Sequence, residues 1–303
     1  MNGNKDLMLL VGDNPFHGIS HLSQERGRIR GDNVTSPEYA ARLVTIATEN
    51  GANGFMFSVN EDTLSILRIM RQTGNIGKLE LHALVPYTYE YVRLANRLGG
   101  ISGLAKKVAK QIVFSGNVKA IVSGLKGVVK MDPVTFMETY LMYEISRIKS
   151  SGGNDARLGS VFLHEVITDM SLAFELDWLF ESYTKFMSKH GITPGFETRN
   201  FAYLIHKFRE WGLDLNRLVI ASPFNKIGFQ MNPTRVDCES ALATLRNPCV
   251  VAMSVFAAGY LSPSEAMDYV LSLPSIGGIV VGVSKEDHAH DTFQLLREKL
   301  KTG

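Results

Sequence analysis

The chain has 303 residues, of which 45% are hydrophobic and 20% charged, and its formal net charge is +2. These values are ordinary for a folded globular protein, and they exclude a disordered chain or a protein that binds nucleic acid through overall positive charge. No apolar run reaches the roughly 18 residues that a membrane-spanning helix needs, so no such segment is expected.

Eight short apolar segments, each followed by a turn and a helical pattern, run through the chain. They cover residues 7–12, 54–58, 79–85, 160–163, 193–196, 218–221, 250–253 and 276–283. Strands that alternate with helices form parallel sheets, and eight such units make a (β/α)8 barrel. The sequence therefore predicts an α/β protein with a single TIM-barrel domain over residues 1–303. An open doubly wound sheet is disfavoured, because no glycine-rich phosphate-binding turn follows the first strand.

The segment between the third and fourth strands is too long for one barrel helix. Apolar residues recur there at helical spacing from Leu104 to Ile148, and Asp132-Pro133 is a typical helix start. We expect the third barrel helix together with a helical insertion over residues 97–150. Between the fourth and fifth strands a single helix is expected, with apolar residues from Leu172 to Phe186.

The predicted insertion has a charge pattern of its own. Residues 91–131 contain eight basic residues and no acidic residue. A basic amphipathic helix can rest on a membrane, meet an acidic partner or cover an anionic substrate. The favoured interpretation is a solvated basic face whose apolar stripe packs on the barrel or on a second copy of the chain. Membrane contact is therefore not expected, and a homo-oligomer formed through the insertion is an open possibility.

Ionisable residues follow several of the predicted strands. In a TIM barrel the catalytic groups lie at the C-terminal ends of the strands. Asp13 and His17 follow the first strand, His164 and Glu165 the fourth, and Glu197 the fifth. These five residues are the catalytic candidates, because carboxylates and imidazoles transfer protons or bind a divalent metal.

A second group of residues is a candidate anion site. Barrels often bind phosphate with the loops after strands seven and eight and a helix N-terminus. Ser254, Gly282 and Ser284 lie in those loops, and Lys226 follows the sixth strand as a candidate cation. Ser284 is also expected to cap the last helix, in a capping-box-like pair with Asp287.

Other residues have a structural interpretation. Cys238 and Cys249 form no CxxC motif, so a disulfide framework is not expected and a reducing cytoplasm is the predicted location. His82 lies within the third strand and is expected to be a core histidine with its hydrogen bonds satisfied. Glu197 has structural alternatives of its own, in which its carboxylate pairs with Arg199 or caps the following helix.

The last two units resemble the end of the aldo-keto reductase superfamily. The matching segments are Val250–Leu261, Ser264–Ser272 and Gly282–His288. The resemblance implies a (β/α)8 barrel in which the Gly-x-Ser turn helps to hold the 2′-phosphate of NADP. It also implies a catalytic Asp, Tyr, Lys and His, of which only the histidine, at His164, has a counterpart. The other three would fall near Ser58, near Thr63 and near Leu84 or Val85.

Three functions remain open at this stage. The first is an enzyme that acts on a small polar metabolite, phosphorylated or not, by acid–base or metal-assisted chemistry at the C-terminal mouth of the barrel. The second is an NADP-dependent oxidoreductase similar to aldo-keto reductases. The third is a non-catalytic barrel that binds a partner or a membrane through its basic insertion. The expected partner is a small molecule, with either a divalent metal or NADP as a possible cofactor.

Overall fold

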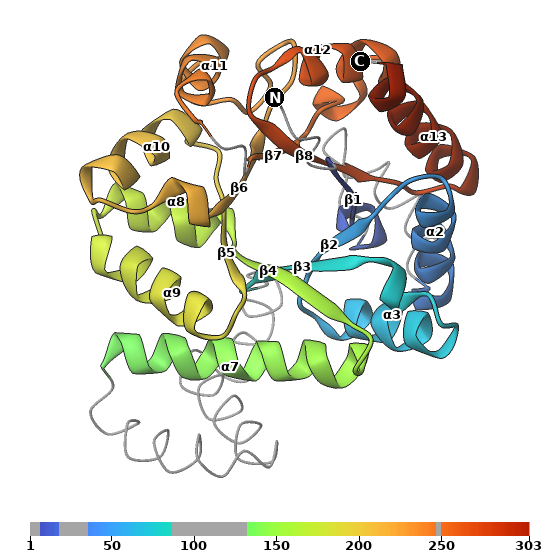
Figure 1. Ribbon diagram of the computed structural model, residues 1–303, viewed down its shortest axis with the longest axis horizontal. Helices are drawn as coiled ribbons and strands as arrows, with labels where there is room; N and C mark the ends of the chain where they lie inside the picture. The colour runs from blue at the N-terminus through green and yellow to red at the C-terminus, as the bar shows by residue number, and fades with distance from the viewer. Residues whose placement is uncertain (1–6, 18–35, 87–131, 247–249, 303) are drawn as a thin grey trace.

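The eight predicted strands form a closed parallel barrel in which the strands follow one another in chain order (Figure 1). The computed structural model describes residues 7–17, 36–86, 132–246 and 250–302. The strands are β1 (Met8–Gly12), β2 (Gly54–Ser58), β3 (Glu80–Val85), β4 (Arg157–Leu163), β5 (Thr193–Glu197), β6 (Val219–Pro223), β7 (Val250–Met253) and β8 (Ile276–Gly282). Leu10 pairs with Gly54 of β2 and with Val280 of β8, so the first and last strands close the barrel. The predicted TIM-barrel fold is confirmed.

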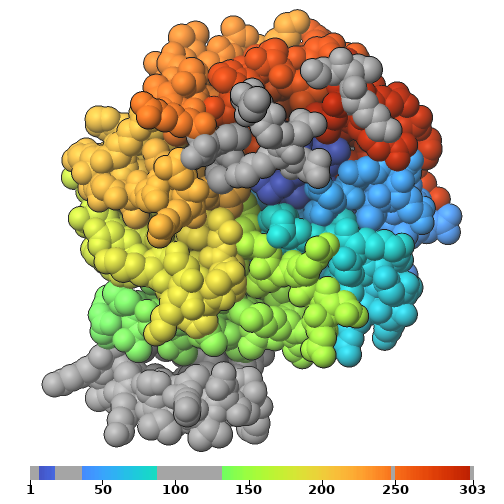
Figure 2. All heavy atoms as spheres, viewed as in Figure 1, coloured from blue at the N-terminus to red at the C-terminus, as the bar shows by residue number. Residues whose placement is uncertain are grey.

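Helices surround this barrel. In the described ranges they are α2 (Pro37–Glu49), α3 (Glu61–Gln72), α7 (Pro133–Gly152), α8 (Glu165–Ala173), α9 (Asp177–Lys189), α10 (Phe201–Glu210), α11 (Arg235–Ala243), α12 (Pro263–Ser272) and α13 (Glu286–Thr302). Short 3-10 helices are η1 (Asn14–His17), η2 (Ile76–Lys78), η3 (Leu215–Arg217) and η4 (Ala257–Gly259). The ring closes where α13 packs beside α2 (Figures 1 and 2). None of the helices that the structure describes is long and apolar enough to cross a membrane.

Residues alternate along each strand between the helix-covered outer face and the interior of the barrel. The inward-facing apolar cluster is Leu10, Met56, Leu84, Phe162, Val219, Ala221 and Val251. Gly195 makes room for the largest of these side chains, because a Cβ atom at this position would lie 2.6 Å from the Phe162 ring. The interior is therefore filled below the C-terminal mouth. Polar residues at the ends of the strands lie above this apolar plug.

The helix between β3 and β4 belongs to the ring. α7 packs against α3 on one side and α9 on the other. Residues 133–150 of the predicted insertion are thus the barrel helix itself, because the apolar face of α7 covers the sheet. The rest of the predicted insertion, residues 97–131, and its basic segment lie outside the described residues.

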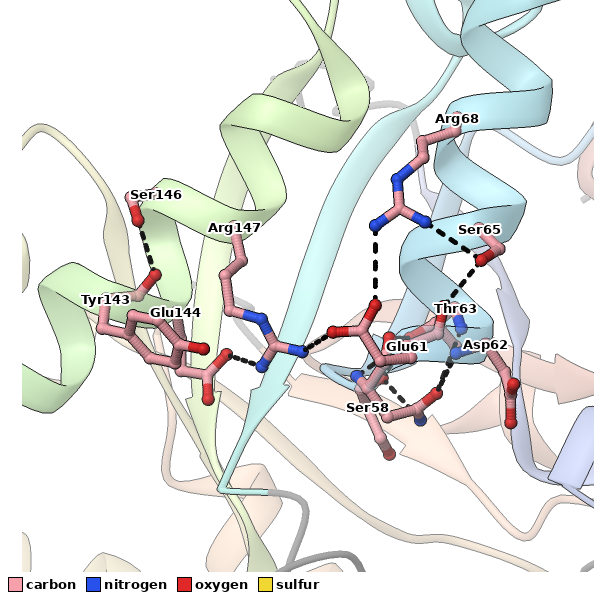
Figure 3. Close-up of polar contacts among 11 residues, drawn as sticks. Ser58, Glu61, Asp62, Thr63, Ser65, Arg68, Tyr143, Glu144, Ser146 and Arg147 are labelled. Carbon is pink, nitrogen blue, oxygen red and sulfur yellow. Dashed lines mark hydrogen bonds and ion pairs between the residues drawn. The ribbon is translucent and has the colours of Figure 1, made fainter. Parts of the chain in front are cut away.

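A polar network joins α7 to α3 (Figure 3). Arg147 donates to Glu144 on its own helix and to Glu61 at the start of α3, both at 2.8 Å. Glu144 is 1% exposed, and Arg68 lies 3.5 Å from Glu61 on the outside. The two helices are therefore held together by charge as well as by apolar packing.

The prediction of a single helix between β4 and β5 is wrong. The structure has two helices, α8 and α9, separated at Glu175, whose φ is 52°. A left-handed residue ends the first helix and turns the chain. α9 covers β5 from the ring, and α8 begins directly after β4.

The start of the last helix also differs from its prediction. The amide of Ala289 donates to the carbonyl of Lys285, and α13 begins at Glu286. The capping position is thus Lys285, since that residue supplies the first helical carbonyl. Ser284 lies one residue too early to cap the helix, and it belongs to the loop that follows β8.

Candidate functional site

A cavity of about 680 Å³ opens at the C-terminal mouth of the barrel. This volume is in the range of small-molecule sites. One side of the cavity carries His164 and Glu165 after β4 and Glu197 and Arg199 after β5. The opposite side is formed by Asp13 after β1, which is paired with β8, and by the loops after β7 and β8, with Ser254, Phe256, Gly259, Gly282 and Ser284 among its residues. The apolar plug beneath includes Met56 and Leu84.

Asp13 is held at the edge of this cavity by three elements. η1 turns the chain so that His17 Nε2 lies 3.0 Å from Asp13 Oδ2. The amide of Ser58, at the end of β2, donates to the same oxygen at 2.7 Å. Asn60, the cap of α3, lies with its Nδ2 3.3 Å from the His17 ring. Asp13 faces the cavity while His17 lies behind it, so the structure makes His17 a positioning group for Asp13.

His164 is the first residue after β4 and faces the cavity. Its Nδ1 accepts a hydrogen bond of 3.2 Å from the amide of Val166 and caps α8. A neutral imidazole whose Nδ1 accepts must carry its proton on Nε2. Burial lowers the pKa of His164, with Glu165 opposing that shift and Arg199 adding to it. His164 is therefore neutral at pH 7 and has one N–H to donate.

Glu197 ends β5 and reaches the same cavity. Desolvation by the surrounding protein, followed by the negative charges of Glu165 and Asp13, raises its pKa to about 8. The amide of Glu165 donates to Glu197 Oε2 at 3.2 Å and opposes part of this effect. These effects together favour the protonated form of the Glu197 carboxyl.

The structural alternative for Glu197, a pair with Arg199, is not formed among the described residues. Arg199 Nε instead donates to Glu165 Oε2 at 2.5 Å. This pairing leaves Glu197 without a direct counter-charge among the described residues, so desolvation remains the largest cause of its raised pKa. Asp169 of α8 fixes the loop, since it accepts from the Thr198 hydroxyl at 2.5 Å and from the Arg199 amide at 3.2 Å.

The four anion candidates divide into two groups. Ser254, Gly282 and Ser284 line the cavity. Lys226 is absent from its described lining, and its Nζ lies 2.6 Å from Glu265 Oε1 at the surface. The structure therefore does not bring Lys226 to the other three.

The loop after β7 has an unusual backbone. Ser254, Ala257 and Ala258 have φ values of 52°, 46° and 59°, and Gly259 follows at 89°. Left-handed backbone is costly for residues with a Cβ atom and tends to persist at binding sites. Ser254, Ala258 and Gly259 all line the cavity, so this strained turn shapes its wall.

The described residues fit the two possible cofactors to different degrees. They contain no group of three or more His, Cys, Asp or Glu side chains that could hold a metal ion. For a nicotinamide nucleotide, the β7–β8 side offers serine hydroxyls and exposed backbone. In the described lining of that side no lysine or arginine is present for the phosphates, so these residues alone do not account for nucleotide binding.

Two solved structures, each of a proposed aldo-keto reductase from Pseudomonas aeruginosa, have a similar fold. The first is 11% identical with a TM-score of 0.60, and the alignment covers 96% of this chain and 90% of that chain. The second is 12% identical with a TM-score of 0.59 and the same coverage. No protein-family model and no curated protein matches the sequence. The resemblance found in the C-terminal residues is thus confirmed as a likeness of fold.

The replaced positions of the aldo-keto reductase tetrad do not supply its chemistry here. Thr63 is fully buried, and its hydroxyl donates to the Ser58 carbonyl at 2.6 Å within the start of α3. Leu84 lines the cavity as an apolar side chain, and Val85 is buried on the outer face. His164 is the one residue at a matching position that brings a polar ring to the cavity.

Proposed function

We propose that the protein is an enzyme that transfers a proton to or from the oxygen of a small polar carbonyl compound or alcohol at the mouth of the barrel. The observation that carries the proposal is the position of Glu197, which ends β5 in the cavity wall together with His164 and accepts a hydrogen bond from the Glu165 amide at 3.2 Å. An acid with a pKa near the working pH is the most effective proton donor.

His164 supports the same role. Its Nε2 is an N–H donor in the neutral ring, as argued above, and Glu197 is a second donor in the same cavity. Two donors directed at one oxygen stabilise the negative charge that develops there when a carbonyl group is attacked or enolised. Glu197 would then give its proton to that oxygen, with His164 orienting the substrate.

Asp13 and Glu165 supply negative charge near the two proton donors. Asp13 is 5% exposed and is held by His17 and Ser58, while Glu165 is held by Arg199. After desolvation, which is the largest cause, both carboxylates add to the rise in the pKa of Glu197. They would act as electrostatic partners of the acid, and Asp13, which faces the cavity, is the candidate base that accepts a proton from the substrate carbon when the carbonyl compound enolises.

The test uses proton exchange and turnover together. The wild-type protein is incubated in D2O with a panel of small carbonyl compounds, with and without NADPH, and products are followed by NMR. We expect Glu197→Gln to lower kcat about 100-fold, because the amide cannot give up a proton. The wild-type rate should fall as the pH rises through about 8, where Glu197 loses its proton.

Glu181→Gln is the matched control, since Glu181 lies on the outside of α9 in an ion pair with Lys185. It should leave the rate and its pH dependence unchanged. A Glu197→Gln variant as active as wild type would refute the role of the acid. A carbon-13 NMR titration of the Glu197 carboxyl with a pKa near 4.5 would refute it independently of any substrate.

A second candidate is reduction of the carbonyl group by a nicotinamide nucleotide. The likeness of fold to proposed aldo-keto reductases favours it. When bound, the nucleotide would supply the hydride, and the donors described above would meet the carbonyl oxygen. Titration of NADPH and NADH against nicotinamide fluorescence decides this branch, and no binding at millimolar nucleotide would remove it.

A further inference from the structure

Arg199 lies in the cavity wall, and within the described residues the end of its side chain has no partner. It is the only lysine or arginine in the lining that the structure describes. Its Nε donates to Glu165, and 30% of the side chain is exposed. Across the described chain, its two terminal Nη nitrogens make no hydrogen bond or ion pair. These two donors are available to a molecule in the cavity.

The arginine is held in place before any ligand arrives. Asp169 accepts from its amide at 3.2 Å, and its carbonyl accepts from the amide of Asn232 at 3.2 Å. Glu165 fixes the guanidinium itself through Nε. A donor pair that is already oriented loses little freedom when it binds, so its hydrogen bonds contribute more to affinity.

The shape and charge of the surroundings select one kind of anion. The two Nη groups present parallel donors that match the two oxygens of a carboxylate. Glu165 already balances the single positive charge, and Asp13 also lines the cavity. A doubly charged phosphate would face two carboxylates with one cation, whereas a planar monoanion needs only the free edge of the guanidinium.

We infer that Arg199 binds the carboxylate group of the substrate, which is therefore a short 2-oxo or 2-hydroxy acid. Glu165, which accepts from Arg199 Nε, follows His164 in the chain. The Glu165 amide donates to Glu197 Oε2 at 3.2 Å, so Arg199 and the two donors are joined through Glu165 in one cavity wall. A carboxylate on the guanidinium places the neighbouring oxygen of such an acid beside the two proton donors. The identity of this oxygen as the reacting atom rests on the proposed function, whereas the carboxylate contact does not.

The binding test is calorimetric titration of the full-length protein with short 2-oxo and 2-hydroxy acids, their methyl esters and inorganic phosphate. We expect the acids to bind about 30-fold more tightly than the esters, the effect of losing charge-assisted hydrogen bonds. Phosphate should bind more weakly than the acids. Equal binding of acid and ester, tighter binding of phosphate, or no binding of any acid at millimolar concentration would overturn the inference.

Substitutions of Arg199 test whether this residue makes the contact with the carboxylate. Arg199→Gln should weaken acid binding by about 30-fold, and Arg199→Lys by less, because a lysine keeps the charge and loses the paired donors. The double variant Arg199→Gln with Glu165→Gln keeps the local charge balanced. It replaces the single variant in the binding test if Arg199→Gln does not fold. Arg217→Gln, at a site that is 80% exposed, is the control and should bind as wild type. Unchanged acid binding in the folded single or double variant would overturn the assignment.

Glu197→Gln separates this inference from the proposed function. It keeps Arg199 and should bind the acids while losing turnover. Tight acid binding together with full turnover in Glu197→Gln would refute the proposed acid and leave the carboxylate site in place. If the wild-type protein bound an acid and its ester equally well, the carboxylate site would be refuted and the proposed acid would remain.

Discussion

His82 lies inside the barrel near the start of β3, at the end away from the cavity. Its Nδ1 lies 2.8 Å from the Ser160 hydroxyl, whereas its Nε2 is buried with no hydrogen-bond partner, 3.7 Å from Glu80 Oε2. The prediction of a core histidine is confirmed, but only one of its two nitrogens is satisfied. Burial lowers the pKa of His82 from 6.5 to about 4.

This shift predicts a loss of stability in acid. The unfolded chain takes up a proton at His82 below pH 6.5 and the folded chain only near pH 4, so the free energy of unfolding falls as pH drops through this window. His82→Asn should flatten that part of the curve, measured by urea unfolding at several pH values. His206→Asn, on a side chain that is 73% exposed, is the control. An unchanged slope in His82→Asn would contradict the prediction.

The candidate site shows how residue-scale chemistry depends on distant neighbours. Asp13, His164, Glu165 and Glu197 could be selected from the sequence because each follows a strand that ends at the same mouth. The partner of Arg199 could not, since the choice between Glu165 and Glu197 depends on the position of α8.

At the scale of the element, α7 is joined to α3 by charged side chains. Arg147 is 16% exposed and connects buried Glu144 with Glu61 of α3 (Figure 3). Sequence periodicity predicts that α7 is a helix, but it cannot distinguish a ring helix from an insertion. The packing of α7 against α3 and α9 shows that it is a ring helix.

Arg147→Met should therefore lower the free energy of unfolding by about 3 kcal/mol, because it removes the cation beside a buried carboxylate. Arg68→Met removes the other cation on Glu61, and as an exposed pair it should cost less than about 1 kcal/mol. Chemical denaturation measures both. The double variant Arg147→Met with Glu144→Leu should recover most of the loss. Equal effects of Arg147→Met and Arg68→Met would contradict the role of the buried pair.

At the scale of the whole molecule, stability depends on closing the barrel between its first and last strands. Gly278 of β8 pairs with Met8 of β1 and lies close to β7. A Cβ atom at this position would lie 2.9 Å from Met8 Cβ and 3.2 Å from Val251 Cγ2. The seam therefore has no room for a side chain here.

Gly278→Val should lower the free energy of unfolding by about 2 kcal/mol through overpacking at this seam. Gly77→Ala is the control, because a Cβ atom there would meet Asp155 at an ordinary 3.7 Å. Thermal and urea unfolding would measure the difference. A Gly278→Val variant as stable as the control would contradict the prediction, because the seam would then accommodate a side chain without loss of stability.

The sequence by itself determined the eight strands, their parallel closure and the group of candidate residues at the mouth. It did so because alternation of strand and helix has few topological solutions, and because strand ends are marked by local composition. The tertiary structure alone decided that α7 is a ring helix, that α8 is separate from α9, and that Lys226 stays outside the cavity while Arg199 enters it. These outcomes depend on contacts between segments far apart in the chain. The pKa of Glu197 depends on the same contacts, because desolvation and neighbouring charge are properties of the assembled site.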